Sequence, residues 1–491
     1  MNFGLVSRLL SVVLIIIALA FALCLCVSIF LDEDIDQNLT TVAFGISLAT
    51  ALLSAGILYW IGRKAPQRFY RREALSVIGL GWILSSLLGS IPFLITTPHI
   101  GISGAIFESV SGITTTGASV LSNLEQLPYS LLFWRSLSQW IGGMGVVVFF
   151  VAILGFLGAG AKLLYANEAS GSTFDFEESR VQSAILRLIY VYLGLSACCA
   201  IAYRFAGMSW FDAVCHMFTT VATGGFSTRT DSIAAFGSAS VEMIGIVFMI
   251  LGAISFPIIL ATLNGRFRRI STNTEFKAFI LILLASATIV SFDIAIEAPG
   301  DDVVNTVRSS IFQTVSILTT TGFATEDFAR WPSLPQAVLV VLMIIGGCSG
   351  STAGGIKINR LVVALRLCIM NVERSFRSRV VRQIRINNRT LSNAATQEIG
   401  IYLILTGVIF LLSVQVASVF EIGTDMGTNL SAVQACLFNI GPGFAGVGPT
   451  ETYDSFHSGT KLFLSLLMIL GRLELYAILT LFAPSMWKRL D

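Results

Sequence analysis

The sequence predicts an all-α, polytopic membrane protein, in which a two-helix leader precedes four pseudo-symmetric span–pore-loop–span repeats around a common axis. Three observations lead to this fold class. The chain of 491 residues is 55% hydrophobic and only 12% charged, which is about half the charged fraction of an ordinary soluble domain. It contains many apolar runs of the roughly 20 residues that cross a bilayer. A short phrase of threonine and glycine recurs between later pairs of these runs.

Ten apolar runs predict ten membrane spans. The first run leads directly into the second, which favours a retained first span over a cleaved signal peptide. The run near residues 334–370 is too long to be one uninterrupted crossing. The predicted spans lie near residues 9–30, 41–61, 74–96, 130–157, 183–206, 238–262, 276–296, 334–370, 397–420 and 460–483.

The charged residues between the runs predict the orientation. Lys and Arg concentrate in alternate loops, and the positive-inside rule places such loops in the cytoplasm. Ten spans then put both termini on the cytoplasmic side. The basic stretches are residues 63–72, 266–277 and 360–389, with Lys488 and Arg489 near the end, and the acidic loops are residues 32–36, 293–302 and 421–425.

Four similar phrases divide the chain into repeats. They read ITTTGAS (113–119), VATGGFS (221–227), LTTTGFA (318–324) and NIGPGFA (439–445). Aligned on one shared glycine, they place Gly117, Gly225, Gly322 and Gly443 at equivalent positions. The predicted divisions are a two-span leader at 1–72 and pore repeats at 73–180, 181–272, 273–392 and 393–491, the third with a broken second helix.

An apolar segment too short to cross the bilayer precedes each phrase, and we interpret it as a half-helix that enters from outside and stops midway. Non-helical backbone at that depth persists only where it lines a wet cavity or is buried in protein. An extended strip of threonine and glycine can aim successive carbonyl oxygens at a dehydrated monovalent cation. Four registered copies favour a cation-selective pore over simple turns or packing contacts. The segments are Ile106–Ile113, Phe211–Val221, Val303–Leu318 and Ala432–Phe438.

The four unequal phrases, the two-span leader and the chain length resemble the Trk/Ktr/HKT superfamily of potassium transporters, in particular its bacterial TrkH-type members. The resemblance implies potassium uptake across the bacterial cytoplasmic (inner) membrane, with K+ as the transported ion and no catalytic cofactor. Serine can replace the first filter glycine in relatives that admit sodium, so Gly117 favours potassium. The fourth phrase lacks threonine and departs most from the others. The implied filter residues are Thr114, Thr115, Thr116, Gly117, Ala222, Thr223, Gly224, Gly225, Thr319, Thr320, Thr321, Gly322, Ile440, Gly441, Pro442 and Gly443.

A glycine-rich stretch, IIGGCSGSTAGGIK (344–357), interrupts the second span of the third repeat. Five glycines among ten residues cannot form a stable helix interior, so the sequence predicts a broken helix that acts as a gate beneath the filter. The alternative is close helix packing through small residues. Lys357 is equally compatible with gating and with snorkelling toward the cytoplasm. The predicted gate residues are Gly346, Gly347, Ser349, Gly350, Gly354, Gly355, Lys357 and Arg472.

Arg472 and Glu474 interrupt the apolar run of the last span. A charge at membrane depth is costly and is rarely kept without a partner or a wet cavity. One interpretation places Arg472 below the filter as an electrostatic barrier to cations, and the family resemblance supports it. The other pairs each charge with a different helix, and the role of Glu474 stays open.

Two other functions fit less well. Gly347–Gly350 mimics the GxSG phrase of intramembrane serine proteases, but that chemistry needs a histidine base beside Ser349, and no apolar span carries a suitably placed one. An enzyme is therefore not expected. A proton- or sodium-coupled potassium symporter on the same scaffold remains open, although Glu474, His216 and Asp212 are the only relay candidates.

The partners follow from charge and from the resemblance. A net charge of +2 without a basic-aromatic pattern gives no indication of nucleic acid. The sequence contains no nucleotide-binding fingerprint, so nucleotide control must come from outside the chain. The resemblance implies a homodimer and a cytosolic nucleotide-binding regulatory subunit. The basic run from Arg374 to Arg389 is compatible with either lipid head groups or that subunit.

Overall fold

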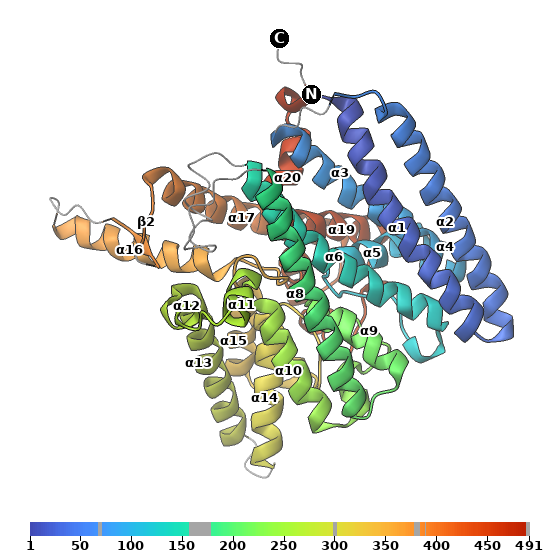
Figure 1. Ribbon diagram of the computed structural model, residues 1–491. Coiled ribbons are helices and arrows are strands. Elements are labelled where there is room, and N and C mark those ends of the chain that lie inside the picture. The colour runs from blue at the N-terminus through green and yellow to red at the C-terminus, as the bar shows by residue number, and fades with distance from the viewer. Residues whose placement is uncertain (67–70, 157–177, 298–301, 378–382, 388, 488–491) are drawn as a thin grey trace.

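The computed structural model describes residues 1–66, 71–156, 178–297, 302–377, 383–387 and 389–487 (Figure 1). This part of the chain is helical apart from loops and one short antiparallel ladder, in which β1 (Arg385–Ile386) pairs with β2 (Arg389–Thr390). The basic residues within 378–382, Asp301 of one acidic loop, and Lys488 and Arg489 lie outside the described residues. The all-α fold is as predicted.

The leader is a pair of long helices at one side of the molecule (Figure 1). Helix α1 (Phe3–Leu31) and helix α2 (Asp34–Gly62) turn at Asp32. The Asp32 carboxylate accepts hydrogen bonds from the N–H and hydroxyl of Ser130, at 3.0 and 2.6 Å. This contact ties the leader to the first repeat. Large apolar side chains such as Leu19 and Leu53, 62% and 67% exposed, cover the outer faces, as expected for surfaces that contact lipid.

Each of the four repeats contains a first helix, a half-helix and a second helix. The first repeat consists of α3 (Arg71–Gly89), α4 (Ile91–Thr96), α5 (Gly101–Ile113) and α6 (Tyr129–Phe156). The second consists of α8 (Glu178–Phe205), α9 (Trp210–Val221), α10 (Ala239–Ala253), α11 (Phe256–Leu263) and α12 (Arg268–Thr272). The third consists of α13 (Thr274–Glu297), α14 (Val303–Leu318), α15 (Ser333–Ile344) and α16 (Ile358–Phe376). The fourth consists of α17 (Asn393–Phe420), α18 (Met426–Leu437), α19 (Ser458–Arg472), α20 (Tyr476–Leu479) and α21 (Pro484–Trp487).

Short 3-10 turns connect several of these helices. They are η1 (Pro98–Ile100), η2 (Leu124–Gln126), η3 (Ser232–Phe236), η4 (Phe328–Arg330), η5 (Ala445–Val447), η6 (Tyr453–Ser455) and η7 (Thr480–Phe482). The half-helices α5 and α18 begin earlier than predicted, at Gly101 and Met426. The first turn of α18 is polar and capped, since the Asp425 carboxylate accepts the N–H of Thr428 at 2.9 Å. Apolar content alone therefore misses where this helix starts.

Two predicted spans are not single straight helices. Among the described residues, six helices are long and apolar enough to cross a membrane, and two further spans are bent pairs. The span near 238–262 bends by 103° between α10 and α11. The backbone is extended at Ile254, and Pro257 in the first turn of α11 has no N–H to donate to a carbonyl of α10, so one continuous helix cannot form. The span near 460–483 bends by 112° between α19 and α20, where Glu474 and Leu475 adopt positive φ angles of 53° and 63°. The predicted break within 334–370 is present between α15 and α16.

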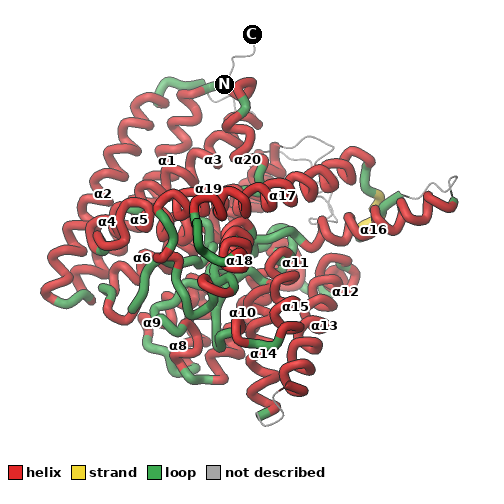
Figure 2. The backbone as a smooth tube through the Cα atoms, turned by 180° about the vertical axis from the view of Figure 1, so that it is seen from behind, coloured by secondary structure: helices red, strands yellow, loops and turns green. Residues whose placement is uncertain are grey.

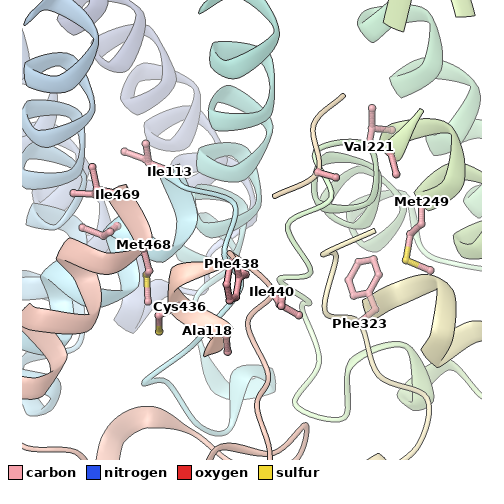
Figure 3. Close-up of a cluster of buried hydrophobic side chains, with 14 of the residues drawn as sticks. Ile113, Ala118, Val221, Met249, Phe323, Cys436, Phe438, Ile440, Met468 and Ile469 are labelled. Atoms are coloured by element: carbon pink, nitrogen blue, oxygen red, sulfur yellow. The ribbon is translucent and has the colours of Figure 1, made fainter. Parts of the chain in front are cut away.

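Loops occupy the centre of the helical body. The view from behind shows loop segments next to α18 surrounded by helices (Figure 2). Apolar side chains from all four repeats pack around these loops (Figure 3). The labelled members are Ile113, Ala118, Val221, Met249, Phe323, Cys436, Phe438, Ile440, Met468 and Ile469. Backbone that is not helical is thus buried in protein rather than exposed to lipid.

One buried ion pair joins a half-helix to the helix that follows it. Arg135 on α6 lies 2.8 Å from the Glu108 carboxylate on α5, and both side chains are almost fully buried. Glu108 also accepts the N–H of Val120 at 3.0 Å, and Arg135 Nη1 donates to Ser227 O at 3.0 Å. The pair therefore joins the first repeat to the second.

We expect Arg135→Met to lower the free energy of unfolding by about 3–5 kcal/mol, because it leaves the Glu108 carboxylate buried without its partner. Thermal denaturation in detergent, followed by size-exclusion chromatography, measures the loss. The matched control is Arg330→Met, since Arg330 pairs with Asp327 at 2.9 Å but is 85% exposed. Exposed pairs contribute about 0–1 kcal/mol. Equal shifts in the two variants would contradict the assignment.

Candidate ion pathway

Each half-helix ends in the same backbone turn, in which two residues, two positions apart, have left-handed φ angles. The first angle is 53° at Thr115, 51° at Thr223, 55° at Thr320 and 56° at Asn439. The second is 84° at Gly117, 78° at Gly225, 82° at Gly322 and 99° at Gly441. The residue between them donates its N–H to the carbonyl five residues earlier, in the pairs Thr116–Ser111 (2.9 Å), Gly224–Thr219 (2.8 Å), Thr321–Ser316 (2.9 Å) and Ile440–Ala435 (2.9 Å). The backbone repeats although the side chains differ.

This geometry corrects the predicted alignment of the fourth phrase. The glycine in register is Gly441, two positions before Gly443, and the equivalent four-residue turn is 438–441. Gly443 instead donates its N–H to Val447 O at 2.7 Å. The sequence alignment placed Gly443 in register because Gly-Phe-Ala occurs in both the third and the fourth phrase. Asn439 replaces the threonine of the other turns, and asparagine is one of the few residues that adopt the left-handed region readily.

The four glycines of these turns close a ring. A Cβ built on Gly117 would lie 2.2 Å from Gly224 O, one on Gly225 1.9 Å from Thr321 O, one on Gly322 2.0 Å from Ile440 O, and one on Gly441 2.8 Å from Thr116 O. Each turn therefore presses against the next, and the fourth returns to the first. Only glycine combines this close approach with a positive φ. We call these four residues the ring glycines.

The alternation of φ also affects the carbonyl groups. In an ordinary extended strand, successive residues point to opposite sides. A left-handed residue at every second position of the turn removes that alternation, so successive carbonyls can face one axis. The ring glycines line a small hollow of about 100 Å³ on the outer side of the turns, with Gly441 but not Gly443 among its lining residues.

Acidic groups surround the outer side. Partial burial raises the pKa of Glu125, but hydrogen bonds from the Thr230 hydroxyl and N–H outweigh this effect and hold the pKa below its ordinary value. Hydrogen bonds from Thr428 likewise lower the pKa of Asp425. Both carboxylates are therefore ionised at neutral pH and raise the local concentration of cations.

On the other side of the turns, residues 345–357 form a loop between α15 and α16, and we call it the intramembrane loop. Its two ends are joined, since Gly346 N–H donates to Ile356 O at 2.9 Å and Ile356 N–H donates to Ile344 O at 3.0 Å. The glycines allow this crossing, because a Cβ on Gly346 would lie 1.9 Å from Gly354 O. Gly350 and Gly355 have positive φ angles of 73° and 66°.

The intramembrane loop contacts three of the four turns directly. Gly355 N–H donates to Phe438 O at 2.9 Å, and Gly354 N–H donates to Thr320 Oγ1 at 2.6 Å. The Thr352 hydroxyl accepts from Thr223 Oγ1 of the second turn at 3.3 Å and donates to Val221 O, at the end of α9, at 3.0 Å. The loop therefore packs against the ends of the second, third and fourth half-helices.

Arg472, at the end of α19, lies against this loop. Its Nη1 donates to Thr352 O at 2.6 Å, and the residue is only 5% exposed. Its Nε and Nη2 have no hydrogen-bond partner among the described residues. Lys357 donates to Ala353 O within the loop. Glu474 pairs with Arg360, whose guanidinium lies 4.0 Å from the centre of the Tyr402 ring. Glu474 therefore forms a contact between helices.

Glu275 at the start of α13 is a residue that the sequence analysis missed. Its Oε1 accepts hydrogen bonds from Ser349 N–H at 2.7 Å, Ser349 Oγ at 3.0 Å and Asn359 N–H at 3.1 Å. It is buried and anchors both the loop and the first turn of α16. A single carboxylate within the basic stretch 266–277 was the available signal.

The residues considered above for protease or proton-relay chemistry form hydrogen bonds within the protein. The Ser349 hydroxyl binds Glu275 rather than an imidazole. His216 bonds to Asp212 O and Ser227 Oγ at 2.8 and 3.0 Å. The Asp212 carboxylate accepts from the Thr228 hydroxyl at 2.6 Å. These contacts fix the turn that follows α9.

We expect Glu275→Ala to loosen the intramembrane loop, because three hydrogen bonds to one carboxylate are lost. Hydrogen bonds to charged groups contribute about 1.5–3 kcal/mol each, so loop opening should increase at least tenfold. The readout is the rate of maleimide labelling of Cys348, which is buried in the loop, in a variant whose other cysteines are serine. Glu297→Ala, at the exposed far end of the same helix, is the control. An unchanged labelling rate would exclude the anchor.

Comparisons with known proteins agree over nearly the whole chain. The sequence profile of the TrkH family, described as cation transport proteins, matches residues 40–489. The Trk system potassium uptake protein TrkH of Salmonella typhimurium is 33% identical over 449 residues, covering 91% of this chain and 92% of that protein. TrkH of Halomonas elongata is 34% identical over 451 residues, with 91% and 92% covered. The crystal structure of the potassium transporter TrkH from Vibrio parahaemolyticus has a TM-score of 0.90 and 30% identity, covering 99% of this chain and 100% of that one.

These similarities confirm the predicted family and fold class. They also confirm that the protein is a multi-pass membrane transporter rather than an enzyme, and transport requires no catalytic cofactor. The chain belongs to the TrkH family of cation transport proteins.

Proposed function

We propose that this chain mediates potassium uptake across the cytoplasmic membrane through a central pore lined by the four turns. The closed ring of glycine contacts carries the proposal, because it brings four equivalent turns to one axis inside the helical body. The similar proteins are Trk system potassium uptake proteins, and their names supply the ion. A proton- or sodium-coupled potassium symporter on the same scaffold is the alternative.

The filter of this proposal consists of residues 114–117, 222–225, 319–322 and 438–441. Their carbonyl oxygens replace the hydration shell of the ion. Pro442 and Gly443 fall outside the filter, which shifts the fourth segment by two residues from the sequence-based prediction. The C-terminal ends of the half-helices carry partial negative charge and add to the attraction for a cation.

The intramembrane loop is the gate. Gly355 N–H donates a hydrogen bond of 2.9 Å to Phe438 O, the carbonyl at the first position of the fourth turn. A carbonyl that accepts this hydrogen bond is less available to an ion. Moving the loop away frees Phe438 O and, in the same step, opens the path below the filter. Glycines at the loop ends can absorb the required changes of φ and ψ.

Arg472 contributes a charge barrier and holds the loop closed through Thr352 O. Lys357 belongs to the same gate, since it donates to Ala353 O within the loop. At roughly 7 Å and an effective dielectric constant of about 20, one unit charge repels another by about 2 kcal/mol. A barrier of this size slows ion passage by more than tenfold.

The remaining parts of the proposal concern orientation and partners. The basic stretches face the cytoplasm, and both termini lie on that side. The leader spans residues 1–72, and the four repeats span 73–180, 181–272, 273–392 and 393–491. We place membrane lipid, a second copy of the chain and a cytosolic nucleotide-binding regulatory subunit as partners. The exposed apolar side chains on the lipid-facing helices support the first of these.

The decisive experiment is rubidium uptake into liposomes that contain the purified chain, with potassium, sodium or lithium as competitor. Competition by potassium alone supports the filter. Uptake that is insensitive to potassium would overturn the proposal. An imposed proton or sodium gradient, added to the same assay, distinguishes coupled symport from simple conduction.

The corrected alignment predicts that Gly441→Ala lowers discrimination between potassium and sodium, whereas Gly443→Ala does not. A Cβ at Gly441 would lie 2.8 Å from Thr116 O at a φ of 99°, so the ring must distort. A Cβ at Gly443 would lie 2.9 Å from Val447 Cγ2 and 3.0 Å from Ser431 Oγ, so these side chains must shift, but no carbonyl of the ring is among its nearest neighbours. The ratio of sodium-inhibited to potassium-inhibited rubidium uptake measures selectivity independently of protein yield. Lower discrimination in Gly443→Ala but not in Gly441→Ala would instead favour the alignment that places Gly443 in register.

We expect Arg472→Gln to raise basal rubidium uptake by about tenfold or more, because the charge barrier is lost. Arg472→Lys keeps the charge and should remain close to the wild-type rate. Size-exclusion chromatography verifies that each variant is assembled. A well-assembled Arg472→Gln protein with unchanged uptake would show that the arginine serves packing alone.

A further inference from the structure

We propose that Gln139 on α6 is a positioning residue for the second segment of the filter and thereby a determinant of ion selectivity. The inference rests on the proposed function and concerns a residue outside the four turns. Gln139 is completely buried. Its Nε2 donates to Gly224 O at 2.7 Å, and its Oε1 accepts the N–H of Phe226 at 3.1 Å.

These two hydrogen bonds lie on either side of the ring glycine Gly225. They use both ends of one amide group and fix the backbone before and after that glycine. Gly224 O is also the oxygen against which Gly117 packs, and Gly225 packs against Thr321 O. Gln139 therefore controls both ring contacts of the second turn.

The second turn has a particular need for this support. Its third position is Gly224, where the other turns have Thr116, Thr321 and Ile440. A Cβ on Gly224 would lie 2.4 Å from both Cδ and Oε1 of Gln139. The glutamine amide thus occupies the volume that a side chain of the turn itself fills in the other repeats.

The other turns are supported from within or from a neighbouring turn. Thr116 Oγ1 bonds to Thr114 Oγ1 at 2.7 Å and accepts from Asn439 Nδ2 at 2.9 Å. Thr321 Oγ1 bonds to Thr319 Oγ1 at 2.8 Å. The second turn has alanine and glycine at the corresponding positions, and a helix of the first repeat supplies the missing hydrogen-bonding group.

This arrangement predicts a compensating substitution. Gly224 does not have a φ in the left-handed range, so threonine can adopt its backbone conformation. Threonine there clashes with Gln139 but fits once the glutamine is shortened. Gln139→Ala together with Gly224→Thr places a threonine at the third position, as in the first and third turns, while Ala222 still stands where those turns have their other threonine.

The test is a double-mutant cycle on the purified full chain in liposomes, with the potassium-to-sodium selectivity of rubidium uptake as readout. Gln139→Ala should lower selectivity by about fivefold, the scale of one buried hydrogen bond. Gly224→Thr alone should reduce both assembly and uptake because of the clash. The double variant should recover selectivity to within about twofold of wild type, a non-additive result that such cycles detect.

Gln139→Met provides a second variant of similar volume without the hydrogen bonds, should the alanine variant fail to assemble. It too should lose selectivity. Gln336→Ala is the matched control, because Gln336 Nε2 also donates to backbone carbonyls, those of Ala329 and Trp331 at 2.8 Å, but at the start of α15 away from the turns. It should keep wild-type selectivity.

Wild-type selectivity in Gln139→Met, or a double variant no better than its worse parent, would overturn the inference. The proposed function fails separately, if the wild-type chain itself does not discriminate potassium from sodium. Loss of selectivity in Gln336→Ala would mean that any lost amide disturbs the ring, and would also overturn the assignment to Gln139.

Discussion

The ring in which each of the four glycines faces a carbonyl oxygen of the next turn is the constraint on which the rest of the structure depends. Each contact joins two repeats, and the last joins the fourth to the first, so no turn can shift without moving its neighbours. The contacts involve backbone alone. They therefore leave side chains free to differ, which explains how Thr-Thr-Thr-Gly and Phe-Asn-Ile-Gly reach the same geometry.

A second set of glycines lets the surrounding helices pack closely against the half-helices that carry the ring. A Cβ on Gly142 of α6 would lie 1.9 Å from Ile113 O, and one on Gly471 of α19 would lie 1.9 Å from Leu437 O. These glycines let the second helix of a repeat touch the last turn of its half-helix. In the third repeat the helix breaks instead, and the intramembrane loop comes close to Thr320. In the third repeat, a loop thus replaces the helix that elsewhere touches the end of the half-helix.

The sequence predicted the helices well because lipid imposes a length and an apolar composition on each span. It also predicted the half-helices and the broken helix of the third repeat. It missed features that depend on tertiary geometry. The left-handed pair Glu474 and Leu475 carries neither proline nor glycine, and Gly441 competes with a second glycine in the same phrase. Gln139 lies in a helix that reads as an ordinary span, so only the contacts reveal what it supports.

The contacts of the intramembrane loop link the proposed gate to the filter. Gly355 and Gly354 bond to the fourth and third turns, while Glu275 and Arg472 hold the loop to the surrounding helices. Backbone groups at this depth cannot turn to lipid for hydrogen bonds, so the loop can leave only if water or other protein groups replace these partners. In the proposed gate, water is the replacement, so opening hydrates the region below the filter. An ion needs the same water, and the loop and the ion path are on this account opened by one event.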